Sequence, residues 1–215
     1  MNSKFKIHFI LEGYEENALF ELIKELIKME KIEISFKNCK GGGLIPAYYQ
    51  NELSLDNYDK IYCVYDVDYK PKDQNGMYSR IRNGLFKVLG SESEVDKISL
   101  CTNPNTLLIL LLGYDDISNL NNIHSDKKSN TELIQKYCSK IGNSKVYDAS
   151  SWQLNLIKNG YIYTKEASFE KMIESMPKLD ENYKSDHVAS NILPVIKALI
   201  SDDVEFFENY MKEDD

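Results

Sequence analysis

The stretch Phe5-Lys6-Ile7-His8-Phe9-Ile10-Leu11 is an apolar run that ends at the carboxylate of Glu12. A second apolar run, Ile61-Tyr62-Cys63-Val64-Tyr65, ends at the triplet Asp66-Val67-Asp68. Such runs are typical of strands that are buried on both faces of a parallel sheet. The carboxyl ends of neighbouring parallel strands lie side by side, and open α/β sheets place their sites there. Glu12, Asp66 and Asp68 are therefore predicted to converge at one edge of the sheet.

Helix and strand patterns alternate around these two runs. In chain order they predict a helix over 14–29, a strand over 32–36, helices over 45–52 and 78–89, and a strand over 98–101. Asn103 and Pro104 then predict the start of a buried helix that closes at Gly113. This order predicts an α/β fold with a central parallel sheet, right-handed crossovers and flanking helices.

The rest of the chain predicts mainly helices. These cover residues 131–141, 152–160, 187–200 and 204–211, with a polar break over 177–184. We place a core over residues 4–114 and a helical C-terminal extension over 115–215. That extension is either a separate unit or a helical cover for the sheet, and it need not fold independently.

The composition limits the kind of partner. The chain has 215 residues with 42% hydrophobic content, which is enough for a sizeable core. Its net charge of −8, with most of the excess acid after residue 114, argues against a protein that coats nucleic acid through its overall field. We therefore expect any anionic substrate to be held locally, by a basic patch or a metal ion.

The spacing of the four cysteines and the length of the apolar segments predict the cellular compartment. Cys39, Cys63, Cys101 and Cys138 are scattered, without the paired spacing of a metal site, and predict reduced thiols. Charged residues interrupt the first apolar stretch, so no signal peptide is predicted. The run 107–112 is far too short to span a bilayer. We expect a soluble, cytoplasmic protein with no membrane partner.

The predicted carboxylate cluster has a definite chemistry. Residues i and i+2 of a strand face the same way, about 6.5–7 Å apart, so Asp66 and Asp68 can flank one metal ion or each bind one of two. Together with Glu12 they offer only oxygen ligands, which suit Mg²⁺ or Mn²⁺ better than zinc. Such ions promote the cleavage of phosphodiester bonds. The alternative is that the aspartates are turn residues and Glu12 is a solvated acid at a helix start.

Two motifs at these positions match a known family. Glu12-Gly13-x-x-Glu16 after a first strand, with Asp66-x-Asp68 after a later one, resembles the Toprim domain of topoisomerases, bacterial primases, the ribosomal RNA maturase and the OLD-type nucleases. The resemblance covers about residues 4–114 and implies a Rossmann-like, Toprim-like sheet. It implies that Glu12 is a general acid/base or a metal-linked glutamate, and that Asp66 and Asp68 bind Mg²⁺. Glu16 matches the second acid of the motif, although acids are favoured in a first helical turn in any case.

The segment from Asn103 resembles a narrower group. Asn103-Pro104 followed by an apolar helix is similar to the small RloB-like Toprim proteins of bacterial defence islands. Those proteins usually carry an acid within this segment and a histidine at its end, where this chain has Leu107 and Gly113.

A group of basic residues follows the aspartates and indicates a nucleic-acid substrate. It consists of Lys70, Lys72 and the only two arginines of the chain, Arg80 and Arg82. Arginine binds phosphate with a planar fork of donors, and the nearby Tyr69 and Tyr78 can stack on unpaired bases. Lys40, beside Gly41-Gly42-Gly43, is a further candidate contact to nucleic acid. The alternative is that these charges form a solvated face of a surface helix.

We interpret the sequence as a Mg²⁺-dependent (or Mn²⁺-dependent) Toprim nuclease, an endonuclease that hydrolyses phosphodiester bonds in DNA or RNA. Antiviral defence against phage is implied by the resemblance alone, as is a sensor or ATPase partner protein. Strand passage and primer synthesis are disfavoured because the chain lacks the additional domains they require. The alternative from another class is a non-catalytic Toprim-like subunit that is regulated by a sensor partner, with the acidic C-terminal half as the docking surface.

Overall fold

The computed structural model describes residues 3–51, 54–67, 75–103, 106, 109, 166–175, 182–183 and 189–210. The strands are β1 (Phe5–Leu11), β2 (Ile32–Asn38), β3 (Lys60–Asp66), β4 (Ser99–Asn103) and β5 (Ala189–Ser190). The α-helices are α1 (Tyr14–Leu26), α2 (Ile45–Asn51), α3 (Met77–Leu89), α4 (Glu92–Ile98), α9 (Glu166–Ser175), α10 (Leu193–Ser201) and α11 (Val204–Asn209). Two short 3₁₀ helices are η1 (Gly42–Leu44) and η2 (Leu55–Asn57).

The strands form one sheet in the order β2-β1-β3-β4-β5. The first four strands are parallel, and β5 pairs antiparallel with β4. The chain moves from β1 outward to β2 and then crosses back past β1 to β3 and β4. The strand order therefore reverses between β1 and β3, which is the switch point where doubly wound sheets place their ligands. The predicted α/β fold with a mostly parallel central sheet is confirmed.

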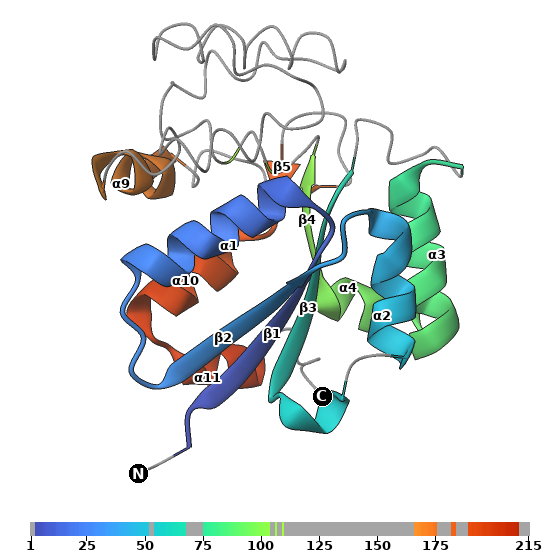
Figure 1. The fold of residues 1–215 in the computed structure, drawn as a ribbon, viewed down its shortest axis with the longest axis horizontal. Helices are drawn as coiled ribbons and strands as arrows, with labels where there is room; N and C mark the ends of the chain where they lie inside the picture. The colour runs from blue at the N-terminus through green and yellow to red at the C-terminus, as the bar shows by residue number, and fades with distance from the viewer. Residues whose placement is uncertain are drawn as a thin grey trace, which may run out of the picture.

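Helices cover both faces of the sheet (Figure 1). Helices α1, α10 and α11 lie on one face, and α2, α3 and α4 lie on the other. Successive residues of a strand point to opposite faces, so Phe9 and Leu11 of β1 pack toward the first layer and Ile10 toward the second. Both faces of β1 are thus buried, which explains its nearly continuous apolar sequence.

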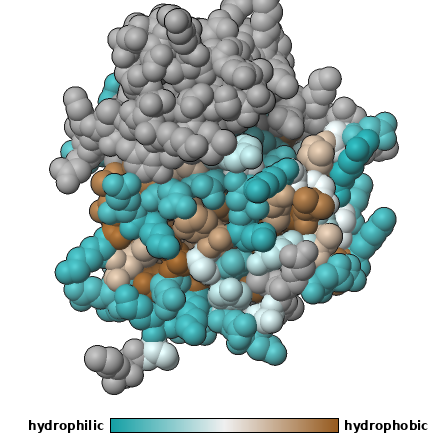
Figure 2. Space-filling model, viewed as in Figure 1, coloured by the Kyte–Doolittle hydropathy of each residue, from teal (hydrophilic) through white to brown (hydrophobic). Residues whose placement is uncertain are grey.

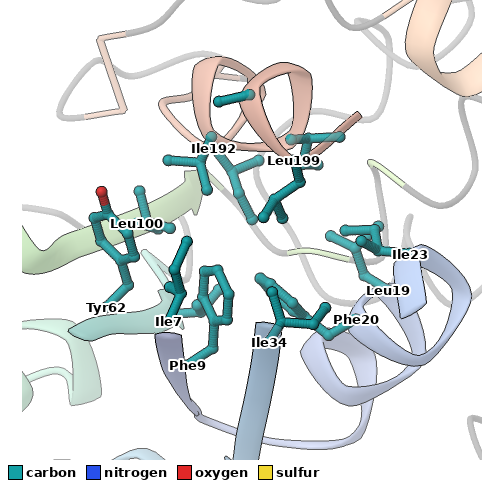
Figure 3. Packing of buried hydrophobic residues seen from close by; sticks show 14 of the residues in the cluster. Ile7, Phe9, Leu19, Phe20, Ile23, Ile34, Tyr62, Leu100, Ile192 and Leu199 are labelled. Atoms are coloured by element: carbon teal, nitrogen blue, oxygen red, sulfur yellow. The ribbon is translucent and has the colours of Figure 1, made fainter. Parts of the chain in front are cut away.

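The larger core lies under α1 and α10 (Figure 3). Ile7 and Phe9 of β1 meet Phe20 of α1 there, with the Phe9 and Phe20 ring centroids 4.3 Å apart. Ile192 and Leu199 close the cluster from the C-terminal part of the chain. Each such side chain contributes roughly 1.5–3 kcal/mol when it is fully buried. This packing holds the ends of β1 and α1 in fixed positions.

The second core face contains three free thiols. Cys39, Cys63 and Cys101 are buried and form no disulfide, as the sequence predicts, and Cys138 lies outside the described residues. Burial raises the pKa of the Cys63 thiol, and it raises the pKa of the Cys101 thiol to about 12. Cys63 and Cys101 are therefore structural side chains and not reactive nucleophiles.

Several predicted elements differ from the observed ones. The helix predicted over 187–200 is interrupted, because 189–190 form β5 and α10 begins at Leu193 with Pro194 in its first turn. Asn103, predicted as a helix N-cap, is the last residue of β4. Helices α4 and α9 were not predicted. The helices predicted over 131–141 and 152–160, and the one predicted to follow Asn103 as far as Gly113, lie almost wholly outside the described residues.

The C-terminal residues 189–210 complete the sheet. The Asn191 side chain accepts a hydrogen bond from the Cys101 N–H at 2.7 Å and donates one to the Ser99 carbonyl at 2.9 Å, as a neighbouring strand would. Asp202, between α10 and α11, accepts the N–H groups of Glu30, Lys31 and Ile32.

The predicted division into two parts at residue 115 stays a prediction, since 110–165 lie outside the described part. None of the helices that the structure describes is long and apolar enough to cross a membrane.

Candidate metal centre

Glu12 and Asp66 meet at the switch point of the sheet. Glu12 follows the last residue of β1, and Asp66 is the last residue of the adjacent β3. The Glu12 N–H donates to the Val64 carbonyl at 2.9 Å, which extends the strand pairing by one residue. In return, Oε2 of Glu12 accepts the Asp66 N–H at 3.0 Å. Glu12 thereby fixes the backbone position from which the Asp66 side chain extends.

The first turn of α1 adds two more carboxylates. Gly13 precedes α1, and its N–H donates to Oε2 of Glu16 at 2.8 Å, so the glutamate caps the helix start. Glu15 and Glu16 both lie in this first turn, where the helix dipole favours negative charge. The turn between β1 and α1 therefore directs Glu16 back toward the sheet edge.

Thr106 fixes the orientation of Asp66. Its backbone N–H and its hydroxyl both donate to Oδ1 of Asp66, at 2.8 and 3.0 Å. Thr106 is fully buried. Two donors on one carboxylate oxygen hold the plane of the carboxylate, as is typical of carboxylates that bind a ligand through their other oxygen.

Glu16 is the unusual member of the cluster. It is 2% exposed, and among the described residues its Oε1 has no hydrogen-bond partner. Burial raises the pKa of Glu16, and hydrogen bonds that its carboxylate accepts, that of the Gly13 N–H among them, oppose this rise. A buried carboxylate oxygen without a partner is costly, so it calls for a proton or a cation.

The carboxylates are close enough to hold one cation. Glu15, Glu16 and Asp66 each offer an oxygen, and these three oxygens lie within 4.8 Å of one another. The donor set contains only carboxylates, which fits a hard cation such as Mg²⁺ or Mn²⁺ and does not fit a site for zinc or copper. Glu12 is not in this group of three; its carboxylate lies beside them and accepts the Asp66 N–H. Asp68, the third predicted ligand, lies outside the described residues.

A glycine loop borders the site. The Gly41 N–H donates to the Glu12 carbonyl at 2.8 Å. A side chain on Gly42 would place its Cβ 2.9 Å from Oε1 of Glu12 and 2.5 Å from Ile81, so only glycine fits without displacing them. Lys40, next to this loop, is exposed and has a left-handed backbone with a φ of 56°. The glycine loop therefore lies against Glu12, one of the predicted site residues.

The two arginines of α3 have different surroundings. Arg80 is exposed. Arg82 is buried, and its guanidinium contacts the carboxylates of Glu92 and Asp96, the latter at 2.7 Å. These contacts join α3 to α4 and give Arg82 a structural role. The predicted contact to phosphate therefore rests on Arg80 and Lys40 within the described part of the chain.

Other predicted contacts to nucleic acid divide in the same way. Tyr78 is 5% exposed and packs against Tyr65, with ring centroids 6.0 Å apart, so it cannot stack on a base. Lys70, Lys72 and Tyr69 lie outside the described residues, and their role stays a prediction.

Two residues of the site were missed from the sequence. Glu15 adjoins Glu16 in an acidic first turn, and the sequence alone did not separate a ligand from a solvated acid there. Thr106 is forty residues from Asp66 in the chain. The only signal for Thr106 in the sequence was its position: it is a polar residue shortly after Asn103-Pro104, at the end of a strand next to β3.

No protein-family model, curated protein or solved structure matches this chain. The resemblance to Toprim domains therefore stays a prediction from the motifs.

Proposed function

We propose that this protein is a Mg²⁺-dependent or Mn²⁺-dependent phosphodiesterase, a nuclease of Toprim type that acts on DNA or RNA. One observation carries the proposal: the Glu16 carboxylate is buried close to those of Glu15 and Asp66 at the switch point of the sheet, and its Oε1 has no hydrogen-bond partner among the described residues. A cation at this point would satisfy Glu16 and offset the repulsion between the carboxylates.

The residues divide into three roles. Glu16 and Asp66, with Glu15, would hold the cation, and Asp68 is proposed as a further ligand. When bound, such a cation polarises a phosphoryl oxygen and lowers the pKa of a bound water. Glu12 holds the Asp66 backbone, and its carboxylate lies beside the site, where it is the candidate to accept or return a proton. Arg80 and Lys40, together with Lys70 and Lys72, would bind the phosphates of the substrate.

The biological setting in this proposal is bacterial defence against phage, and it comes from the motif resemblance alone. A sensor or ATPase partner belongs to the same inference. The choice between DNA and RNA is left to the experiment, which offers both.

The experiment combines a binding readout with an activity readout. At a hundredfold excess of Mg²⁺ over its Kd, the parent protein should be stabilised by about 2.7 kcal/mol and should cleave single- or double-stranded DNA or RNA. Asp66→Asn and Glu16→Gln should lose most of the stabilisation and the cleavage. Glu25→Gln, an exposed acid on the same helix, is the matched control and should keep both.

The two readouts separate the competing interpretations. A parent protein that neither gains stability with Mg²⁺ or Mn²⁺ nor cleaves any nucleic acid would refute the nuclease proposal. The non-catalytic partner subunit would then replace it.

A further inference from the structure

Strand β2 forms one end of the sheet, and its outer edge is open in the part of the chain that the structure describes. Only β1 pairs with it among the described strands, and β2 lies at the front of the sheet in Figure 1. Figure 2, in the same view, shows hydrophobic residues among hydrophilic ones on this side of the molecule. Unpaired strand edges present rows of N–H and C=O groups that can pair with another strand.

The hydrogen bonds of β2 define which groups face outward. The Phe5 N–H donates to the Lys31 carbonyl, and the Cys39 N–H donates to the Leu11 carbonyl. In a parallel ladder, the odd-numbered residues of β2 therefore pair with β1, and the even-numbered residues direct their backbone groups away from the sheet. The N–H of Ile32, which this parity directs away from β1, donates to Oδ1 of Asp202 at 3.0 Å.

The open part of the edge is short and has defined ends. Asp202 occupies the edge at residues 30–32. At the other end the chain turns away at Lys40 and Gly41, both of which have a positive φ. The segment between them is 33–39, and its first five residues, 33–37, have Ser35 at their centre.

The sequence of this segment is complementary to itself. In an antiparallel pair centred on Ser35, Glu33 lies opposite Lys37 of the second copy, and Lys37 lies opposite its Glu33. Ile34 and Phe36 then exchange backbone hydrogen bonds with each other, as their outward groups require. The Glu–Lys pairs fall at positions without backbone hydrogen bonds, where side chains approach most closely. Shifting the register by two residues removes both pairs, and in one direction it places Lys31 opposite Lys37.

We propose that the outer edge of β2 binds the same edge of a second copy of this chain, antiparallel and centred on Ser35, so that two sheets join into one. The interface is small, so the association belongs to the weak end of specific interfaces. The two strands run in opposite directions, so the two candidate metal centres open toward opposite ends of the dimer. The proposal does not depend on the proposed nuclease function.

Charge reversal tests the pairing. Sedimentation of the full chain should show a monomer–dimer equilibrium that weakens with added salt. Glu33→Lys and Lys37→Glu should each place like charges opposite one another and raise the dimer Kd by roughly tenfold or more. The double variant E33K/K37E restores both pairs and should recover the parent Kd. Glu208→Lys on α11, with the same charge change, is the control and should dimerise like the parent.

Hydrogen exchange locates the interface. The amides of Ile34 and Phe36 should exchange more slowly at high protein concentration. The exchange rates of the Glu33, Ser35 and Lys37 amides, which point toward β1, should not change. Far-UV circular dichroism checks the fold of each variant, and if one single variant fails to fold, the other provides the same test. A parent protein that stays monomeric, a Glu33→Lys variant that dimerises normally, or a double variant that does not recover would each overturn the proposal.

Discussion

Glu16 uses its two oxygens for different purposes. Oε2 accepts the Gly13 N–H and caps α1, while Oε1 is buried without a hydrogen-bond partner in the described part of the molecule. A glutamate that only capped the helix could leave its second oxygen in water. The burial of this oxygen is therefore the strongest indication that the cluster binds a ligand.

Thr106 should tune the affinity of the cluster for the cation. Replacing it by valine removes the hydroxyl that donates to Asp66 but keeps the shape and the backbone N–H. We expect a loss of stability of about 1 kcal/mol and a Kd for Mg²⁺ that is higher by about tenfold. Isothermal titration measures the Kd. Thr106→Ser keeps the hydroxyl and should bind Mg²⁺ like the parent; equal affinity in the valine variant would show that Thr106 does not position Asp66.

His8 should make the protein sensitive to mild acid. Burial lowers the pKa of His8 to about 4, from an ordinary value of 6.5. Between these two values the unfolded chain binds a proton that the folded chain does not, so stability should fall as the pH falls from 6.5 toward 4. The loss should approach about 3 kcal/mol near pH 4 and change little below it.

The measurement is the free energy of unfolding by urea across this pH range. In His8→Asn, the fall in the free energy of unfolding between pH 6.5 and pH 4 that is due to His8 should disappear. This holds whatever the change in absolute stability. An identical slope in parent and variant would mean that His8 does not carry the effect.

At the scale of elements, the glycine loop is predicted to support Glu12. Gly42→Ala would force the new methyl group against Glu12 and Ile81, so it should cost about 1–2 kcal/mol and weaken Mg²⁺ binding. Gly43→Ala is the matched control, because nothing lies within 4 Å of its added Cβ. Thermal unfolding with and without Mg²⁺ compares them. Equal behaviour of the two variants would contradict a role for the loop in holding Glu12.

The two arginines of α3 should separate binding from stability. Arg80→Ala should weaken the binding of nucleic acid and reduce its salt dependence, with little change in melting temperature, because Arg80 is exposed. Arg82→Ala removes the contacts of the guanidinium to Glu92 and Asp96 and should cost about 1–3 kcal/mol, or roughly 5 °C. Fluorescence anisotropy and calorimetry measure the two effects. A reversed pattern would contradict the roles assigned to both residues.

The sequence predicted those elements whose local pattern is strong. The apolar runs before Glu12 and Asp66 identify β1 and β3, and Gly90, with a φ of 78°, ends α3 where predicted. The predictions from sequence were wrong where tertiary contacts determine the local structure. Ser190 forms β5 because its hydroxyl and backbone pair with Thr102 and Cys101 of β4, although the flanking residues have helical spacing. From the sequence, Arg82 is interpreted as a surface charge, because helix α4 was not predicted. In the structure α4 places Glu92 and Asp96 next to Arg82.

At the scale of the whole molecule, the topology explains why the site forms where it does. The chain reverses direction across the sheet between β1 and β3, so the loops after these strands diverge to opposite faces and leave room between them. Glu12 and Asp66 occupy this point, and α1 directs its first turn toward it. The same topology leaves β2 at the end of the sheet, far in strand order from β5, with an edge suited to self-pairing.

The proposed function requires Glu16 and Asp66 to bind a divalent cation together. The most direct measurement is anomalous diffraction from crystals of the protein grown with Mn²⁺, compared with crystals of the Glu16→Gln variant. We predict a single strong anomalous peak about 2 Å from Oε1 of Glu16 and from the Asp66 carboxylate, and its loss in the variant. Parent crystals with no peak at this position, or a peak that persists unchanged in Glu16→Gln, would rule out a cation shared by Glu16 and Asp66.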